Sequence, residues 1–395
     1  MKPYFIIIAL SLSIASPLVA QEKSARDSVL AEARQLKSLF RADKAIELLS
    51  TQVSQDFDEE ILAELAECHL QNGNAETAAD TYTLLSLRSP NNLAYKLKLM
   101  QIWFRLKAYP QCIAAGQEVL QRDSIPAVLS YVGDAFQQIS QPDSALAYYR
   151  QSLALHPGNP GVIAKAGNLM LALKDYDGAL ELTRAFLQDN PDHPVVAPVC
   201  GVALFRKENY EEAARLFQRL EDQGNDGYAL HNYLGQSYWQ TGILYRAKQE
   251  LLAAWQIDSS DVSLAYSLAA INAESRSGPF LETVKPWLDK AIEMTRPEPI
   301  LMSRIHQQYA GGYFRVPDLD QAIFHYKEAY RYNPKLTPLL RQIAYCYELK
   351  KDPKNALTWY EKYLSKATPG TQGYEFAAKS IELLKVELFM SEPAR

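Results

Sequence analysis

Apolar positions recur along this chain in a pattern that predicts pairs of helices. In each stretch an apolar residue precedes a small one, and a large residue follows three positions later, as in Val132-Gly133 with Phe136. Spacings of three and four place such residues on one face of a helix. Twelve positions on, a second small residue begins the pattern again. These pairs are Ala33 with Ala45, Ala66 with Ala78, Gly133 with Ala145, Gly167 with Ala179, Gly201 with Ala213, Gly235 with Ala247, Ala310 with Ala322 and Ala344 with Ala356.

The paired pattern repeats with a period near 34 residues. Two antiparallel helices pack closely only where small residues let their backbones approach, so this period predicts stacked helix-turn-helix repeats. Prolines at one register, such as Pro157 and Pro191, end one helix before the next begins. We expect ten repeats, which begin near Arg26, Glu59, Leu93, Pro126, Pro160, Pro194, Tyr228, Val262, Ser303 and Thr337.

Large aromatic residues follow the second small residue of many repeats, as in Ala145 with Tyr149 and Ala213 with Phe217. With these residues the chain resembles the tetratricopeptide repeat family from Arg26 to about Ser365. The resemblance implies an all-α fold, a right-handed α-solenoid of about ten helix-turn-helix repeats. It also implies that the first helices line a concave groove in which peptide ligands lie.

Two repeats depart from the pattern. The repeat that begins at Leu93 has Met100 and Cys112 where small residues are expected, and this predicts a local distortion. The repeat over residues 262–302 is longer, because it reaches its second helix through residues 276–280 and contains Pro286, which should kink or delay that helix. Such an insertion can carry binding or bend the superhelix.

The two ends of the sequence predict a signal peptide at the N-terminus and a capping helix near the C-terminus. Residues 1–20 combine Lys2 with an apolar run and a polar shift at Gln21, which is typical of a secretory signal peptide. An uncleaved membrane anchor is the alternative, although the run is shorter than the ~20 apolar residues that span a bilayer. The repeats should fill residues 21–368, and residues 369–395 should form a capping helix and a tail.

The net charge of −5 over 395 residues offers no basic excess, so nucleic acid is not expected as the main ligand. The four cysteines are too few for a disulfide scaffold and lie in different repeats. Buried, unpaired thiols are the expectation. A bridge between Cys68 and Cys112 stays open.

No catalytic motif is found: the phosphate loop, the G-x-S-x-G elbow and the H-E-x-x-H zinc pair do not occur. The six histidines are scattered, and Cys68-His69 has no second pair to complete a metal site. The sequence therefore predicts neither an enzyme nor a cofactor nor a metal.

Binding residues follow from the resemblance. The groove positions lack the Lys-Asn pair with which some family members hold a terminal carboxylate. They are instead aromatic and neutral, which suits an extended peptide or an amphipathic helix. Some of them could equally pack between first helices, Phe205 and Trp239 above all. The candidate groove residues are Tyr131, Lys165, Phe205, Tyr233, Gln236, Trp239, Tyr266, Phe314 and Tyr345.

We expect a non-catalytic scaffold or adaptor of the cell envelope, exported to the periplasm of a Gram-negative-type bacterium or secreted, that binds another protein in the groove. One alternative is an envelope protein that captures carbohydrate or another nutrient, with aromatics stacked on sugars. Another is the periplasmic arm of a membrane-anchored machine. Membrane contact is expected only if the signal stays uncleaved.

Overall fold

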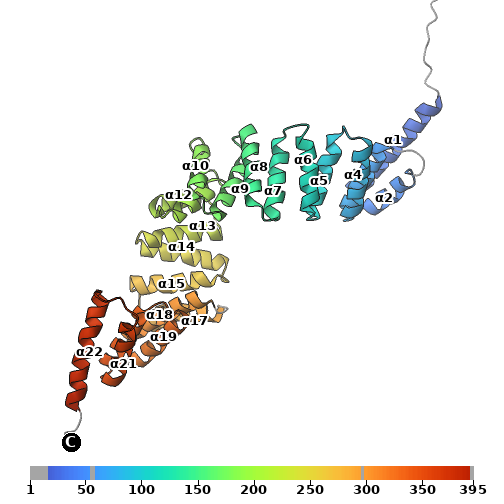
Figure 1. Ribbon diagram of the computed structural model, residues 1–395. Helices are drawn as coiled ribbons and strands as arrows, with labels where there is room; N and C mark the ends of the chain where they lie inside the picture. Colours follow the sequence, from blue (N-terminus) through green and yellow to red (C-terminus); the bar gives the residue numbers. More distant parts are fainter. Residues whose placement is uncertain (1–16, 54–57, 295–297, 392–395) are drawn as a thin grey trace, which may run out of the picture. The chain divides into compact units, whose positions relative to one another are not determined.

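A computed structural model describes residues 17–53, 58–294 and 298–391, and every regular element in them is a helix (Figure 1). Most of the predicted signal peptide, residues 1–16, lies outside the described residues. None of the helices in the described part is both long and apolar enough to cross a membrane. The chain divides into an N-terminal body, which ends at Leu173, and a C-terminal body, which begins at Lys174.

In the N-terminal body each helix packs against the next one along the chain. Its helices are α1 (Pro17–Ser38), α2 (Ala42–Ser50), α3 (Glu59–Gln71), α4 (Ala75–Arg88), α5 (Leu93–Arg105), α6 (Tyr109–Leu120), α7 (Pro126–Gln138), α8 (Pro142–Leu155) and α9 (Pro160–Ala172).

The C-terminal body continues in the same way with α10 (Tyr176–Leu187), α11 (Ala197–Arg206), α12 (Tyr210–Asp222), α13 (Tyr228–Gln240), α14 (Leu244–Ile257), α15 (Val262–Ser275), α16 (Phe280–Thr283), α17 (Lys285–Met294), α18 (Pro299–Arg315), α19 (Leu319–Tyr332), α20 (Pro338–Leu349), α21 (Pro353–Leu364) and α22 (Gln372–Ser391). The predicted α-solenoid of helix-turn-helix repeats is confirmed. Three expected starts were wrong: α1 begins nine residues before Arg26, α11 begins three residues after Pro194, and α18 begins four residues before Ser303.

Small residues lie where the two helices of a repeat meet, as the sequence predicted. A Cβ atom added to Gly133 would be 2.7 Å from the Tyr149 ring, and one added to Gly201 would be 2.6 Å from the Phe217 ring. Both rings are almost fully buried. The aromatic side chain of the second helix therefore occupies the space that the glycine of the first helix leaves open.

The turn between the two helices has one recurring backbone conformation. A residue with positive φ follows the first helix at the same register in successive repeats, and most of these residues are not glycine. They are Phe40, Gly73, Lys107, Ser140, Lys174, Glu208, Gly242, Arg276 and Lys351. The left-handed conformation reverses the chain within a few residues, which keeps the repeats short.

The long repeat has its break where proline predicted it. After α15 the chain takes the usual left-handed turn at Arg276, with φ of 48°, but then continues through an extra loop. The second helix is split into α16 and α17, and Pro286 is the second residue of α17. The predicted distortion of the Leu93 repeat was wrong, because α5 and α6 are regular helices of 13 and 12 residues.

The last helix, α22, covers α21. Ala377, Ile381 and Leu384 are buried there with residues of α20 and α21. The outer face of α22 is not polar, since Val386 is 57% exposed and Phe389 is 80% exposed.

The four cysteines are buried and unpaired, so no Cys68–Cys112 bridge forms. Burial raises the pKa of all four thiols, to about 12 for Cys112 and about 11 for Cys346. These side chains therefore act as apolar packing groups.

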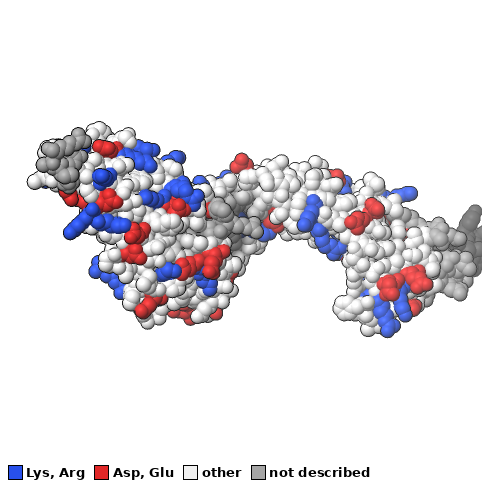
Figure 2. Space-filling model, turned by 90° about the horizontal axis from the view of Figure 1, so that it is seen from below, with Lys and Arg blue, Asp and Glu red and all other residues white. Residues whose placement is uncertain are grey.

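Charged side chains of both signs are interspersed on the face shown in Figure 2, between wide neutral areas. No extended patch of one sign is visible on this face. This mixed surface agrees with the absence of a basic excess in the sequence.

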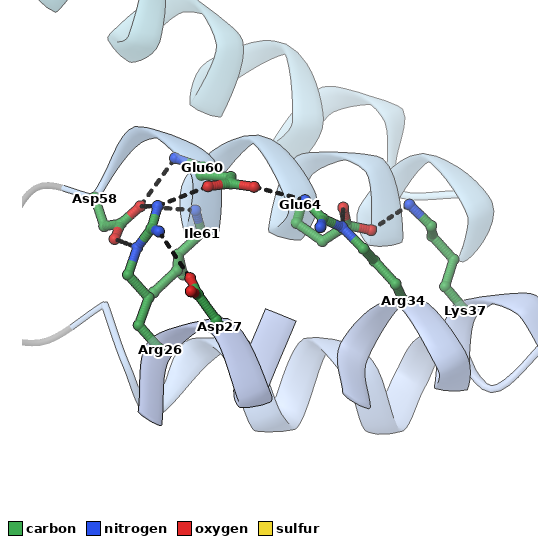
Figure 3. A network of polar contacts seen from close by, with 8 residues as sticks. All are labelled: Arg26, Asp27, Arg34, Lys37, Asp58, Glu60, Ile61 and Glu64. Carbon is green, nitrogen blue, oxygen red and sulfur yellow. Dashed lines mark hydrogen bonds and ion pairs between the residues drawn. The ribbon is translucent and has the colours of Figure 1, made fainter. Parts of the chain in front are cut away.

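A ladder of ion pairs joins α1 to α3 (Figure 3). Arg26 binds Asp58 and Glu60, and Arg34 binds Glu60 at 2.8 Å and Glu64 at 3.1 Å. Asp58 also caps α3, because its carboxylate accepts hydrogen bonds from the backbone N–H groups of Glu60 and Ile61. The hydrogen bond from Arg26 lowers the pKa of Asp58, and the one from Arg34 lowers the pKa of Glu60.

Candidate functional site

The predicted groove residues belong to different bodies. Tyr131 and Lys165 lie in the N-terminal body, and the other seven lie in the C-terminal body. Tyr131 on α7 is half-buried against Phe104 on α5, with ring centroids 4.9 Å apart. The Lys165 ammonium on α9 binds Asp134 on α7 at 2.7 Å. Each residue therefore contacts a neighbouring first helix.

In the C-terminal body the candidates form a row across α11, α13 and α15. Phe205 on α11 meets Tyr233 on α13 edge to face, with centroids 5.3 Å apart. The Gln236 amide donates a hydrogen bond to Ser267 at 3.2 Å, a residue of α15. Trp239 Nε1 donates to Glu274 at 2.7 Å, also on α15. Packing between first helices, the alternative for Phe205 and Trp239, is present in both cases.

The remaining three candidates continue along α15, α18 and α20. Tyr266 is 8% exposed and lies beneath the Arg304 guanidinium, which is 4.9 Å from its ring. Phe314 and Tyr345 are half-buried, with centroids 6.1 Å apart. The face that these helices present is thus aromatic, but Tyr266 contributes little exposed surface to this face.

A cavity that the sequence did not predict lies at the long repeat, between the end of α15, the extra loop and α18. Its volume is about 560 Å³, and Arg276, Phe280, Gly311 and Arg315 are among its lining residues. The insertion at residues 276–280 could be predicted from the sequence, but the helix that faces it across the cavity could not. The signal in the sequence was the pair Gly311-Gly312 inside a helical stretch, where glycine is unfavourable.

One group of described residues has the composition of a metal site. Oxygen atoms of Glu221 and Glu250 and a ring nitrogen of His231 lie within 4.8 Å of one another. The ring is already engaged, since Nδ1 is 2.8 Å from Glu250 and Nε2 is 2.8 Å from Asp226. Burial alone would lower the pKa of His231, but these hydrogen bonds outweigh it and raise the pKa. An imidazolium between carboxylates accounts for this geometry.

Two histidines that the sequence places on different helices of one repeat meet between α18 and α19. The Nδ1 atoms of His306 and His325 are 2.9 Å apart, so one ring donates its proton to the other. Tyr309 stacks on His325 with centroids 4.5 Å apart. Burial, followed by the neighbouring His306, lowers the pKa of His325 to about 4. The pair is therefore neutral near pH 7 and serves as packing.

Comparison with solved structures finds similar folds at low identity. A tetratricopeptide repeat protein from Parabacteroides merdae ATCC 43184 is 16% identical, with 63% of this chain and 98% of that chain covered and a TM-score of 0.47. The C-terminal part of a repeat-containing protein from Cytophaga hutchinsonii is 13% identical, with 61% and 96% covered and a TM-score of 0.48. MamA from Desulfovibrio magneticus RS-1 is 16% identical, with 43% and 94% covered and a TM-score of 0.39.

Family models give the more specific comparison. No curated protein matches the chain in sequence. Two models described as tetratricopeptide repeat match residues 140–200 and 201–262, which include α8 to α14. Most helix pairs outside this range have the same register of small residues and left-handed turns, and the pair α5–α6 departs from it in its small residues. The chain is a tetratricopeptide repeat protein.

Proposed function

We propose that this protein is a non-catalytic scaffold of the cell envelope that binds a peptide or an amphipathic helix of another protein. Tetratricopeptide repeats indicate a protein–protein interaction scaffold, and the proposal adds the place and the kind of ligand. The signal-like residues 1–20 support the envelope. The binding surface is the first-helix face of the C-terminal body, made by α11, α13, α15, α18 and α20.

One observation carries the choice of this surface. Aromatic side chains of neighbouring first helices pair there while staying partly exposed, as in Phe205 with Tyr233 and Phe314 with Tyr345. Such rings are held in place by their neighbours, so they lose little rotamer freedom when a ligand covers them. Amides such as Gln236 lie between them and supply hydrogen bonds to a peptide backbone.

The test begins with capture. The chain from Gln21 onward is immobilised, envelope extracts are passed over it, and retained proteins are identified and titrated back as purified partners. A scaffold retains a protein that binds reproducibly in titration. Retention of no protein, together with binding of a sugar in the same assay, would replace the scaffold with the nutrient-binding alternative.

Matched variants locate the surface. Tyr233→Ala and Tyr345→Ala remove first-helix aromatics, whereas Tyr245→Ala and Phe324→Ala remove exposed aromatics of second helices. The first two should each weaken partner binding by ~1–3 kcal/mol, as truncated hot spots do. The second two should leave affinity unchanged. Equal losses in all four variants would remove the first-helix face as the site.

A further inference from the structure

The cavity at the long repeat is built by residues that other repeats lack. The extra loop brings Phe280 against α18, and Arg276 lies at the start of this loop. Residues from the ends of α15 and α18 complete the wall of a space of about 560 Å³. The insertion thus creates a pocket beside two first helices of the C-terminal body.

Two adjacent glycines in α18 have different surroundings. A Cβ atom on Gly312 would be 2.0 Å from the Phe280 ring, so packing against the loop requires this glycine. A Cβ atom on Gly311 would meet nothing within 4 Å. Glycine inside a helix lowers its stability, and no packing contact explains it at position 311. Gly311 lines the cavity and keeps it open.

The lining of the cavity is positively charged. It contains Arg276 and Arg315, and none of its described lining residues is acidic. Arg315 Nη1 is 3.5 Å from the carbonyl oxygen of Ala273, and neither guanidinium pairs with a carboxylate of a described residue. A guanidinium that lacks such a partner can bind a carboxylate of a ligand through two parallel hydrogen bonds.

A buried amide in the wall has unused donors. Asn272 is 2% exposed and lines the cavity. Its Oδ1 accepts a hydrogen bond from Ser277 at 2.9 Å, but its amide nitrogen donates to none of the residues that the structure describes. Among the described side chains only His69 Nδ1 is a fully buried polar atom without a partner, so the Asn272 nitrogen is open to the cavity and can donate to a ligand there.

We propose that this cavity binds a carboxylate of a peptide segment, with Arg276 and Arg315 as its ion-pair partners and Asn272 as a hydrogen-bond donor. An apolar side chain beside the carboxylate packs on Phe280. The proposal rests on the proposed function and adds an acidic site for the partner. It does not use the aromatic row of α11 and α13.

Three labelled peptides test the chemistry by fluorescence anisotropy. The first alternates Leu and Glu with both ends blocked, the second replaces each Glu with Gln, and the third is the Gln peptide with a free C-terminal carboxylate. Binding of the first and not the second supports a side-chain carboxylate. Binding of the third and not the second supports a terminal one. Equal binding of all three peptides, or of none, overturns the proposal.

Variants of the full chain test the place with whichever peptide binds. Arg276→Gln combined with Arg315→Gln should weaken binding at least tenfold. Gly311→Leu should fill the cavity, abolish binding and keep the melting temperature at or above that of the parent. Arg331→Gln, on the second helix α19, is the control and should bind as the parent does. Parental affinity in Gly311→Leu would overturn the proposal.

The two proposals fail differently. If Gly311→Leu keeps the affinity for the captured partner while Tyr345→Ala loses it, the scaffold stands and the cavity is not its acidic site. If the parent chain captures no protein, the proposed function fails, and the peptide measurements still decide whether the cavity binds carboxylates.

Discussion

Met100 of α5 lies against Gly116 of α6, which reverses the arrangement of the next repeat, where Gly133 lies against Tyr149. A Cβ atom on Gly116 would be 3.2 Å from the Met100 sulfur, and one on Gly133 would be 2.7 Å from the Tyr149 ring. The large and the small side chain have exchanged helices, and the volume between the helices stays filled. This exchange explains why the repeat at Leu93 is regular although its sequence departs from the pattern.

Gly116→Ala should therefore destabilise the protein by about 1–3 kcal/mol, although alanine is the better helix former. The added Cβ would be 2.3 Å from Val132 as well as close to Met100. Gly158→Ala is the control, because its Cβ would meet nothing within 4 Å. Chemical denaturation of both variants measures the difference, and equal stability would refute the exchange.

The left-handed turns predict a reciprocal pair of substitutions. Glu208→Gly should stabilise the protein by up to about 1 kcal/mol, since relief of the left-handed strain of ~1–2 kcal/mol is partly offset by the freedom of glycine in the unfolded chain. Gly242→Glu is the reverse substitution at the next turn. It should destabilise the protein by a similar amount. Melting of both variants checks the signs, and a shared sign would contradict the strain.

Deletion of α22 should uncover the buried face of the repeat before it. Without Ala377, Ile381 and Leu384, the apolar residues of α20 and α21 that they cover would be exposed to water. We expect self-association in sedimentation or a lower melting temperature. Phe389→Glu changes only the exposed face and should alter neither. An unchanged mass and melting temperature after the deletion would show that α22 is a tail.

Asp58 should stabilise the protein in two separable ways, as the cap of α3 and as the ion-pair partner of Arg26 on α1. Asp58→Ala removes both the cap and the charge and should cost about 1 kcal/mol, whereas Asp58→Asn keeps a capping oxygen and should cost less. The lowered pKa values of Asp58 and Glu60 mean that their contribution is complete above the unfolded values of 3.8 and 4.5 and is lost as the pH falls. Amide exchange of α3 at pH 7 and pH 3 measures this loss. Equal effects of both substitutions would assign no role to the capping oxygen, and no effect of Asp58→Asn would assign no role to the charge.

The histidine pair predicts acid sensitivity in the C-terminal body. The folded pKa of His325 is below its unfolded value of 6.5, so the unfolded chain binds the proton first. Stability is complete above pH 6.5 and falls as the pH approaches 4. His325→Phe keeps a ring beside Tyr309 without the charge and should reduce this loss in denaturation measured from pH 7 to pH 4.5.

His231 should change the stability with pH in the direction opposite to that of His325. Its folded pKa is raised, so its contribution is complete below pH 6.5 and is lost as the pH rises through the folded pKa. His231→Gln should therefore cost more stability at pH 6 than at pH 8. The same pH trend in both histidine variants would contradict the two assignments.

The helix pairs could be predicted because each helix has one small residue at a fixed position. This pattern can be recognised within a single repeat, without information on contacts to distant residues. Ala33 with Ala45 and Gly235 with Ala247 place their helices without knowledge of the neighbouring repeat. The exchange of Met100 and Gly116 was missed because it depends on two positions together. The left-handed turns were missed because lysine, serine and glutamate there do not mark the conformation.

The exposure of the candidate groove residues could not be predicted from the sequence. Tyr266 lies on the first helix α15, but its burial by Arg304 and the neighbouring helices comes from adjacent repeats. The cavity at Gly311 depends on a contact between the loop and α18, in which Phe280 and Gly311 lie 31 residues apart in the chain. Their meeting follows from the split second helix, whose path no local pattern specifies.

The four buried thiols can serve as probes of local unfolding. Cys68, Cys112, Cys200 and Cys346 lie on α3, α6, α11 and α20, and each becomes reactive only when its own helices separate. A thiol reagent added to the folded chain would therefore label them in the order in which the repeats open. The rates would show where along the chain the solenoid begins to unfold.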